Sequence, residues 1–202
     1  MSKILVVTGD AGESYEAWYA VHRLREAGYT PVVAAPSSRR LHLVMHDFEP
    51  GWDTYVERPG YGMTADIAFD QVNVSEYQAI LLLGGRAPEY LRHNQELLEI
   101  VCEFEQTGKW LFAICHGIQI LIAAGVVAGK RVTCYENVRA EVVQCGGTYS
   151  NEQAVRDGRV VTAQVWQSHP EFYREVLACL ESDSAEVKAG PTAAQAPVNA
   201  VS

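Results

Sequence analysis

The sequence lacks paired cysteines. Its five cysteines are an odd number, they lie far apart along the chain, and no two of them form a C-x-x-C pair. A disulfide scaffold and a structural zinc site both need such pairs, so neither is expected here. The cysteines are therefore candidates for core packing or, at a suitable position, for chemistry.

Basic segments and long apolar runs are also missing. The formal net charge is -9, and no basic run offsets it locally, which argues against a nucleic-acid partner. No stretch is long and apolar enough to span a membrane. Met1-Ser2-Lys3 leads directly into an apolar strand, without the features of a signal peptide. We therefore expect an acidic cytoplasmic protein without a membrane partner.

The sequence does contain a regular alternation of apolar strands and amphipathic helices. Its 202 residues, 48% of them hydrophobic, are enough for one core. The predicted strands are 4–7, 31–35, 79–83, 111–114 and 131–134, and the predicted helices lie within 17–27, 97–107, 118–124 and 170–180. Continuously apolar strands that alternate with helices indicate an α/β fold, with a mostly parallel sheet covered on both faces.

Three segments depart from this alternation. Residues 36–78 are rich in glycine, proline and aromatic residues, and we interpret them as an irregular insertion that covers a site or serves assembly. Asp157-Gly158 predicts a small β-hairpin. From Ser182 the periodicity ends, so we expect a single domain over 1–181 and a flexible low-complexity tail over 182–202.

The run from Leu111 to Gly117 is the most informative segment. An apolar strand ends at Cys115 and is followed by His116, Gly117 and an apolar helix pattern. A strand-to-helix turn of this kind presents one side chain above the edge of a sheet, as in the elbow of α/β-hydrolases. A thiol at the amino end of a helix should ionise more easily than a free thiol, which predicts a nucleophile at Cys115.

Two other strand ends carry features that support a site. Gly9-Asp10 and Gly84-Gly85 each follow a predicted strand, as Cys115 does. Parallel sheets bind ligands beyond the carboxyl ends of their strands, so these three segments should converge at one edge.

Taken together, these motifs resemble the ThiJ/PfpI superfamily. The resemblance rests on Cys115-His116-Gly117, on Gly84 to Glu89 and on the early Glu16, and it covers the chain up to the tail. It implies a flavodoxin-like three-layer α/β/α sandwich of the class I glutamine-amidotransferase type. The segments around Tyr15-Glu16 and His46-Asp47-Phe48 are most similar to a plant tandem-domain branch, whose members are described as glutathione-independent glyoxalases.

The resemblance also implies roles for several residues. Cys115 would be the nucleophile, and Glu16 the glutamate that faces it as proton carrier or general base. Glu13 is interpreted as a surface residue in the first turn of the same helix. In PfpI-like members, the histidine that matches His116 is completed by a glutamate of a neighbouring subunit, which matches Glu89. Neighbours on a tight turn usually point apart, so His116 need not contact the thiol of its own chain.

Weaker candidates surround this set. The N–H groups of Gly85 and His116 could form an oxyanion hole. His169 matches a family histidine with a substrate-orienting or acid role. Gly84, His46 and Trp18 are expected to line the pocket, and no second cluster near His46 and Asp47 supports a metal. Aromatic residues in 36–78 suggest an interface in a homo-oligomer, either a dimer or a hexamer.

Three functions remain open on this reading. The first is a glyoxalase of type III, which converts methylglyoxal or a related small carbonyl substrate to a 2-hydroxy acid and requires no glutathione, metal or organic cofactor. The second is a PfpI-type intracellular cysteine protease or amidase. The third is a redox-sensing stress-response protein, since an accessible thiolate oxidises readily.

Overall fold

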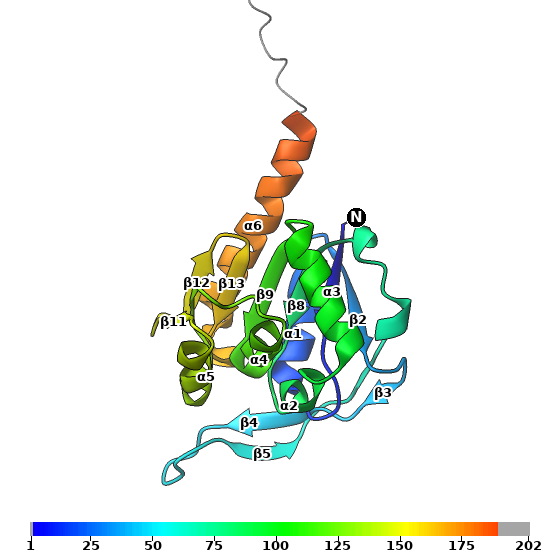
Figure 1. Cartoon of the computed structure of the whole chain (residues 1–202). Coiled ribbons are helices and arrows are strands. Elements are labelled where there is room, and N and C mark those ends of the chain that lie inside the picture. The colour runs from blue at the N-terminus through cyan, green and yellow to red at the C-terminus, as the bar shows by residue number, and fades with distance from the viewer. Residues whose placement is uncertain (1, 190–202) are drawn as a thin grey trace, which may run out of the picture.

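A seven-stranded sheet forms the centre of the molecule (Figure 1). The computed structural model describes residues 2–189. In the order β12-β13-β9-β8-β1-β2-β7, the central strands are Ala154–Asp157, Val160–Ala163, Trp110–Ile114, Tyr77–Leu82, Lys3–Val7, Thr30–Ala35 and Ile67–Ala68. All neighbouring strands pair in parallel except β12 and β13. The predicted mostly parallel sheet is therefore confirmed.

Helices cover both faces of this sheet. They are α1 (Ser14–Glu26), α2 (Ala87–Leu91), α3 (Gln95–Gln106), α4 (Ile118–Ala123), α5 (Arg139–Gln144) and α6 (His169–Ala189). In Figure 1, α3 and α4 lie in front of the strands and α1 lies behind them. Helix α6 packs beside α1, where the rings of Tyr19 and Tyr173 are 5.1 Å apart. The result is the three-layer α/β/α sandwich that the sequence predicted.

The central strands are apolar along their whole length because both of their faces are covered. Every residue from Ile4 to Val7 is fully buried, as is every residue from Ala79 to Leu82. Removing such side chains from water on both faces of a sheet is the main source of stability in this class of fold. The polar positions lie just beyond the strand ends, where the apolar pattern stops.

The register brings three strand ends together. Val7 of β1 is opposite Leu82 of β8, and Leu82 is opposite Ala113 of β9. The segments that follow these strands contain Gly9, Gly84 and Cys115, so they meet at one edge of the sheet. This is the convergence that the sequence predicted.

The insertion 36–78 is more ordered than we expected. It contains β3 (Arg40–Leu41), β4 (Val44–Asp47), β5 (Val56–Pro59) and β6 (Met63–Thr64), which form two antiparallel pairs, β3 with β6 and β4 with β5. It also supplies β7, which extends the central sheet beside β2. These strands are two to four residues long, too short for a periodic pattern to show in the sequence.

The predicted hairpin at Asp157-Gly158 is confirmed, since β12 and β13 pair antiparallel, and both strands belong to the central sheet, where β13 also pairs with β9. The strand predicted at 131–134 is only β10 (Arg131–Val132), which pairs with β11 (Thr148–Tyr149) outside that sheet. The predicted boundary at 181 falls inside α6, which continues to Ala189, and the rest of the predicted tail, 190–202, lies outside the described residues. Within residues 2–189, no helix has the length and apolar character needed to span a membrane.

Candidate active site

Cys115 occupies the turn between β9 and α4. The backbone enters a single 3-10 turn, Cys115–Gly117, and Cys115 itself has a φ of 59°, in the left-handed region that few side chains adopt. Such strained positions gather at functional sites, where the surrounding structure enforces them. The thiol is 6% exposed, so it is approached only from the edge of the sheet.

Glu16 is fully buried beside the thiol. Its Oε2 accepts a hydrogen bond of 2.6 Å from the backbone N–H of Gly84, which fixes the carboxyl at the end of β8. Its Oε1 is also buried and has no hydrogen-bond partner among residues 2–189. One oxygen is thus held by the backbone, whereas the other carries no such bond.

Gly84 makes this arrangement possible because it has no side chain. A Cβ at this position would lie 2.6 Å from the Cβ of Cys115, 2.9 Å from Oε2 of Glu16 and 3.0 Å from the sulfur. No real Cβ makes contacts this short. The close approach of thiol, carboxyl and backbone therefore requires glycine at residue 84.

Glu13 is a buried residue and not the surface residue that we predicted. It is 2% exposed and caps α1, with its Oε2 accepting a 2.6 Å hydrogen bond from the N–H of Glu16. Burial raises the pKa of Glu13 to about 7, while N–H groups of Glu16, His46 and Tyr15 act in the opposite direction. Its place directly before the first helical residue is the sequence signal that could have identified it as a cap.

The surroundings of Glu16 favour its protonated form. Burial raises the pKa of Glu16 well above its usual value, and the neighbouring carboxyl of Glu13 raises it further. A protonated carboxyl donates a hydrogen bond, and it can act as a base only after it has lost its proton. The first proton transfer available to Glu16 is therefore donation.

The thiol does not ionise as easily as its place before a helix suggested. Burial raises the pKa of Cys115 well above its usual value, and proximity to Glu16 raises it too. The backbone N–H groups of His116 and Gly85 act against this because they are directed at the sulfur. These two N–H groups stabilise the thiolate form of Cys115 when no substrate is bound. Their use as an oxyanion hole stays a prediction.

His116 contacts the thiol of its own chain, a contact that the sequence left open. Its Nδ1 lies 3.3 Å from the sulfur of Cys115. Burial lowers the pKa of His116 to about 4, so the imidazole is neutral at pH 7 and can accept the S–H. The tight turn holds both side chains on the same side because Cys115 has a positive φ.

Aromatic side chains from distant segments surround His116. The ring of Tyr135 is 5.0 Å from the imidazole, and the ring of Tyr55 is 6.0 Å away at 89°. Tyr55 also stacks on His46 at 4.0 Å, which places His46 at the wall of the site. Sequence reasoning missed Tyr135 and assigned Tyr55 to an interface, because neither residue lies in a motif that marks it.

Three predicted residues are not among the side chains that hydrogen-bond the thiol in the described part of the chain. Glu89 is exposed in the first turn of α2. His169 is buried against the rings of Tyr15 and Tyr19, and within residues 2–189 neither of its ring nitrogens has a hydrogen-bond partner. Trp18 lines a separate cavity of about 740 Å³ along α1, which corrects our placement of it in the catalytic pocket. The roles of Glu89 and His169 stay predictions.

Comparison with known proteins identifies the family. The model of the DJ-1/PfpI family matches residues 2–179. This chain belongs to the DJ-1/PfpI family. Among its relatives, an Arabidopsis thaliana protein named "Protein DJ-1 homolog D" is 39% identical over 185 residues, which are 88% of this chain and 47% of that relative. This chain thus spans about half the length of the plant protein.

Two further proteins are similar to this chain, one in sequence and one in structure. A Pyrococcus furiosus protein named "Deglycase PfpI" is 36% identical over 162 residues, covering 80% of this chain and 89% of that relative. The crystal structure of a ThiJ/PfpI domain protein from Brachyspira murdochii superposes with a TM-score of 0.77 at 20% identity, covering 90% and 96% of the two chains. That structure supports the fold alone.

The first prediction for this DJ-1/PfpI protein concerns Gly84. Gly84→Ala should displace the thiol and the Glu16 carboxyl, and so slow alkylation of Cys115 by iodoacetamide by about tenfold or more. The rate is measured by mass spectrometry of the Cys115 peptide. Gly147→Ala is the control, because its Cβ would meet Val127 and Val142 far from the thiol. Equal effects of both substitutions on the rate would contradict this account of Gly84.

The second prediction concerns stability and pH. The folded protein keeps a proton on Glu13 that the unfolded chain releases, so the free energy of unfolding should fall as pH rises from about 4.5 to 7. Glu13→Gln keeps an acceptor for the N–H of Glu16 and removes the titration. Urea unfolding should show the variant gaining roughly 1–3 kcal/mol relative to wild type across this range.

The control is Glu26→Gln, on the exposed end of the same helix. Its free energy of unfolding should run parallel to that of wild type at every pH. If the Glu13 variant also ran parallel, the buried carboxyl would not be the source of the pH dependence.

Proposed function

We propose that this protein is a cysteine enzyme that converts methylglyoxal or a related small 2-oxoaldehyde to a 2-hydroxy acid. The observation that carries the proposal is the buried carboxyl of Glu16 beside the thiol of Cys115, with a pKa that burial raises. Converting a 2-oxoaldehyde to a 2-hydroxy acid moves a hydrogen between adjacent carbons. A carboxyl that is shielded from water and able to give and take a proton suits that step.

The first step forms a covalent adduct. The sulfur of Cys115 attacks the aldehyde carbon, a C–S bond forms, and the thiol proton passes to Nδ1 of His116, 3.3 Å away. The aldehyde oxygen becomes an alkoxide and takes the proton of Glu16. The product is a hemithioacetal, and Glu16 is now a carboxylate.

Glu16 then carries out the isomerisation. Its carboxylate removes the hydrogen from the former aldehyde carbon, which leaves an enediolate with its charge on the neighbouring oxygen. The proton on the first oxygen passes to that neighbouring oxygen, and Glu16 returns the proton it removed to the neighbouring carbon. The first carbon is thereby oxidised to a thioester and the second is reduced to an alcohol. Water then attacks the thioester, the C–S bond breaks and the sulfur recovers its proton from His116. The 2-hydroxy acid gives its carboxyl proton to Glu16 as it is released, which restores the starting state.

A second candidate is removal of a carbonyl adduct from an amine. Several relatives are named deglycases, among them the Pyrococcus furiosus protein. The same nucleophile and proton carrier could act on such an adduct. Proteolysis is less well supported, since a thiol that is 6% exposed is poorly accessible to a folded polypeptide.

We also propose that the protein forms a homo-oligomer, either a dimer or a hexamer. Glu89 is exposed on α2, so it is free to approach the site of a neighbouring subunit. Such a contact would add a carboxylate to the surroundings of His116. Small-angle scattering of wild type and Glu89→Ala would measure the assembly.

The third prediction tests the enzyme directly. Lactate formation from methylglyoxal should be abolished in Cys115→Ala, which removes the nucleophile. In Glu16→Gln it should fall by about 10²–10⁴-fold, because the proton carrier is lost. Cys102→Ala should retain wild-type turnover, since Cys102 lies in α3 away from the site. Turnover that survives Cys115→Ala would overturn covalent catalysis.

The same assay separates the candidate functions. A preformed adduct of methylglyoxal with N-acetylarginine is followed with and without enzyme. Loss of adduct no faster than its spontaneous release of aldehyde supports the glyoxalase, and faster loss supports the deglycase. If no lactate forms and one peroxide equivalent oxidises Cys115, the redox-sensor function is favoured instead.

A further inference from the structure

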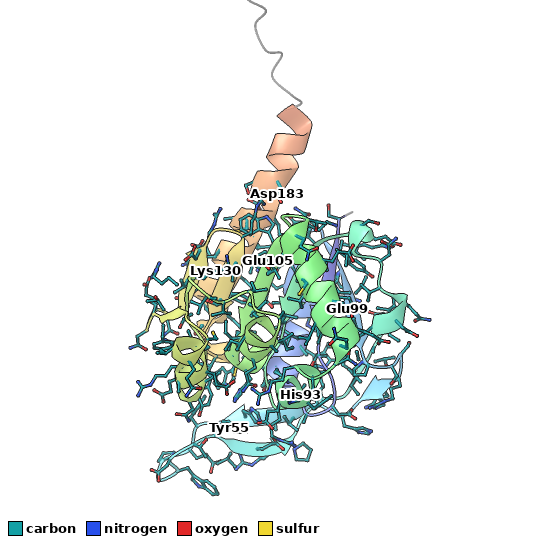
Figure 2. The ribbon with its side chains drawn as sticks, in the orientation of Figure 1. Tyr55, His93, Glu99, Glu105, Lys130 and Asp183 are labelled. Carbon is teal, nitrogen blue, oxygen red and sulfur yellow. The ribbon has the colours of Figure 1, made fainter. Side chains whose placement is uncertain are left out.

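The β4–β5 hairpin lies across the edge of the sheet that carries the thiol. Its strands, Val44–Asp47 and Val56–Pro59, run below α2 in Figure 1. The base of the hairpin is tied to the loop before α1, since the N–H of Val44 donates to the carbonyl of Gly12 at 2.9 Å. In Figure 2, Tyr55 lies at this end of the molecule, opposite Asp183.

A polar clamp holds the middle of the hairpin. Glu57 accepts two hydrogen bonds from Arg86, from Nε at 2.6 Å and from Nη2 at 2.8 Å. The same carboxylate lies 2.9 Å from Nε2 of His46 on the opposite strand. Arg86 directly precedes α2, so this pair joins the hairpin to the segment that follows Gly84-Gly85. A bidentate pair of this kind fixes orientation as well as distance.

A third contact fastens the hairpin from the other side. The indole N–H of Trp166 donates to the carbonyl of His46 at 3.0 Å. Trp166 lies in the turn before α6, on the opposite side of the site from α2. The hairpin is thus bonded on two sides, whereas Trp52 at its tip is 62% exposed.

The clamp fixes Tyr55 over the residues that flank the thiol. Tyr55 stacks on His46 at 4.0 Å and meets the ring of His116 edge-on at 6.0 Å. The ring of Tyr135 is 5.8 Å from that of Tyr55. His116 in turn contacts the sulfur of Cys115. The phenol ring of Tyr55 therefore lies beside the imidazole that contacts the sulfur.

We propose that Tyr55 is a specificity-determining residue, held by the His46–Glu57–Arg86 clamp so that only 2-oxoaldehydes with a small substituent reach Cys115. The inference rests on the proposed function and deepens it by naming the substrate class. A 2-oxoaldehyde presents its reactive carbon at one end and its substituent at the other. A fixed aromatic wall beside His116 limits the room for that substituent, because packed side chains yield little to a larger group.

The fourth prediction compares a small and a bulky substrate, methylglyoxal and phenylglyoxal. Wild type should prefer methylglyoxal in kcat/KM. Tyr55→Ala should lower that preference by about tenfold or more, mainly by lowering KM for phenylglyoxal. Tyr55→Phe keeps the ring and should keep the preference. Trp52→Ala, at the exposed tip of the same hairpin, is the matched control and should also keep it.

An alkylation assay tests the role of Tyr55 without requiring turnover. The rates of Cys115 modification by iodoacetamide and by N-phenyl iodoacetamide are compared in each variant. Tyr55→Ala should raise the relative rate of the bulky reagent, and Glu57→Gln should do so to a smaller degree because it removes the charge that holds Arg86. Circular dichroism and the urea midpoint verify that each variant is folded.

The outcomes distinguish the two proposals. If no variant turns over either aldehyde but Tyr55→Ala changes the alkylation ratio, the glyoxalase function fails and the role of Tyr55 stands. If Tyr55→Ala leaves both ratios unchanged, the role of Tyr55 is overturned. If Tyr55→Ala changes the two ratios but Glu57→Gln leaves them unchanged, Tyr55 restricts access without help from the clamp. That result would contradict the proposed role of the clamp.

Discussion

The site depends on a single close approach, that of the Cys115 thiol and the Glu16 carboxyl over the backbone of Gly84. Cys115 follows β9, Gly84 follows β8 and Glu16 lies in the first turn of α1, which follows β1, and the parallel register of β1, β8 and β9 brings the three together. The hydrogen bond from Gly84 to Glu16 and the turn at Cys115 then fix the distances. The apolar strands supply the free energy that keeps this strained edge in place.

Burial of two carboxyls is the main electrostatic cost of this arrangement. Glu13 caps α1 and Glu16 lies in its first turn, and both have raised pKa values because they are buried. The hydrogen bond from the N–H of Glu16 to Glu13 offsets part of the cost. The same burial favours the protonated form of Glu16, so what destabilises the fold also shifts this carboxyl towards the pKa range of a proton carrier.

The walls of the site come from segments that are remote in sequence. The hairpin within 36–78 provides His46 and Tyr55, and the loop after β10 provides Tyr135. The hairpin is joined to the start of α2 and to the turn before α6, so three parts of the chain determine the position of one aromatic ring. The candidate reactive groups therefore lie at the strand ends and at the start of α1, and aromatic rings from remote segments surround them.

The sequence by itself determined the sheet, its parallel character and the edge that carries the site, because long apolar strands and helical periodicity are local patterns. It also identified Cys115, Glu16 and Gly84, which lie at strand ends or at the start of a helix. Tertiary structure alone decided the burial of Glu13, the contact between Cys115 and His116, and the place of Tyr55. Each of these depends on how distant segments pack and exclude water, and no local pattern records that. The raised pKa of the thiol shows the difference: the sequence indicated a helix N-terminus that favours charge, and burial, which only the folded chain imposes, outweighed it.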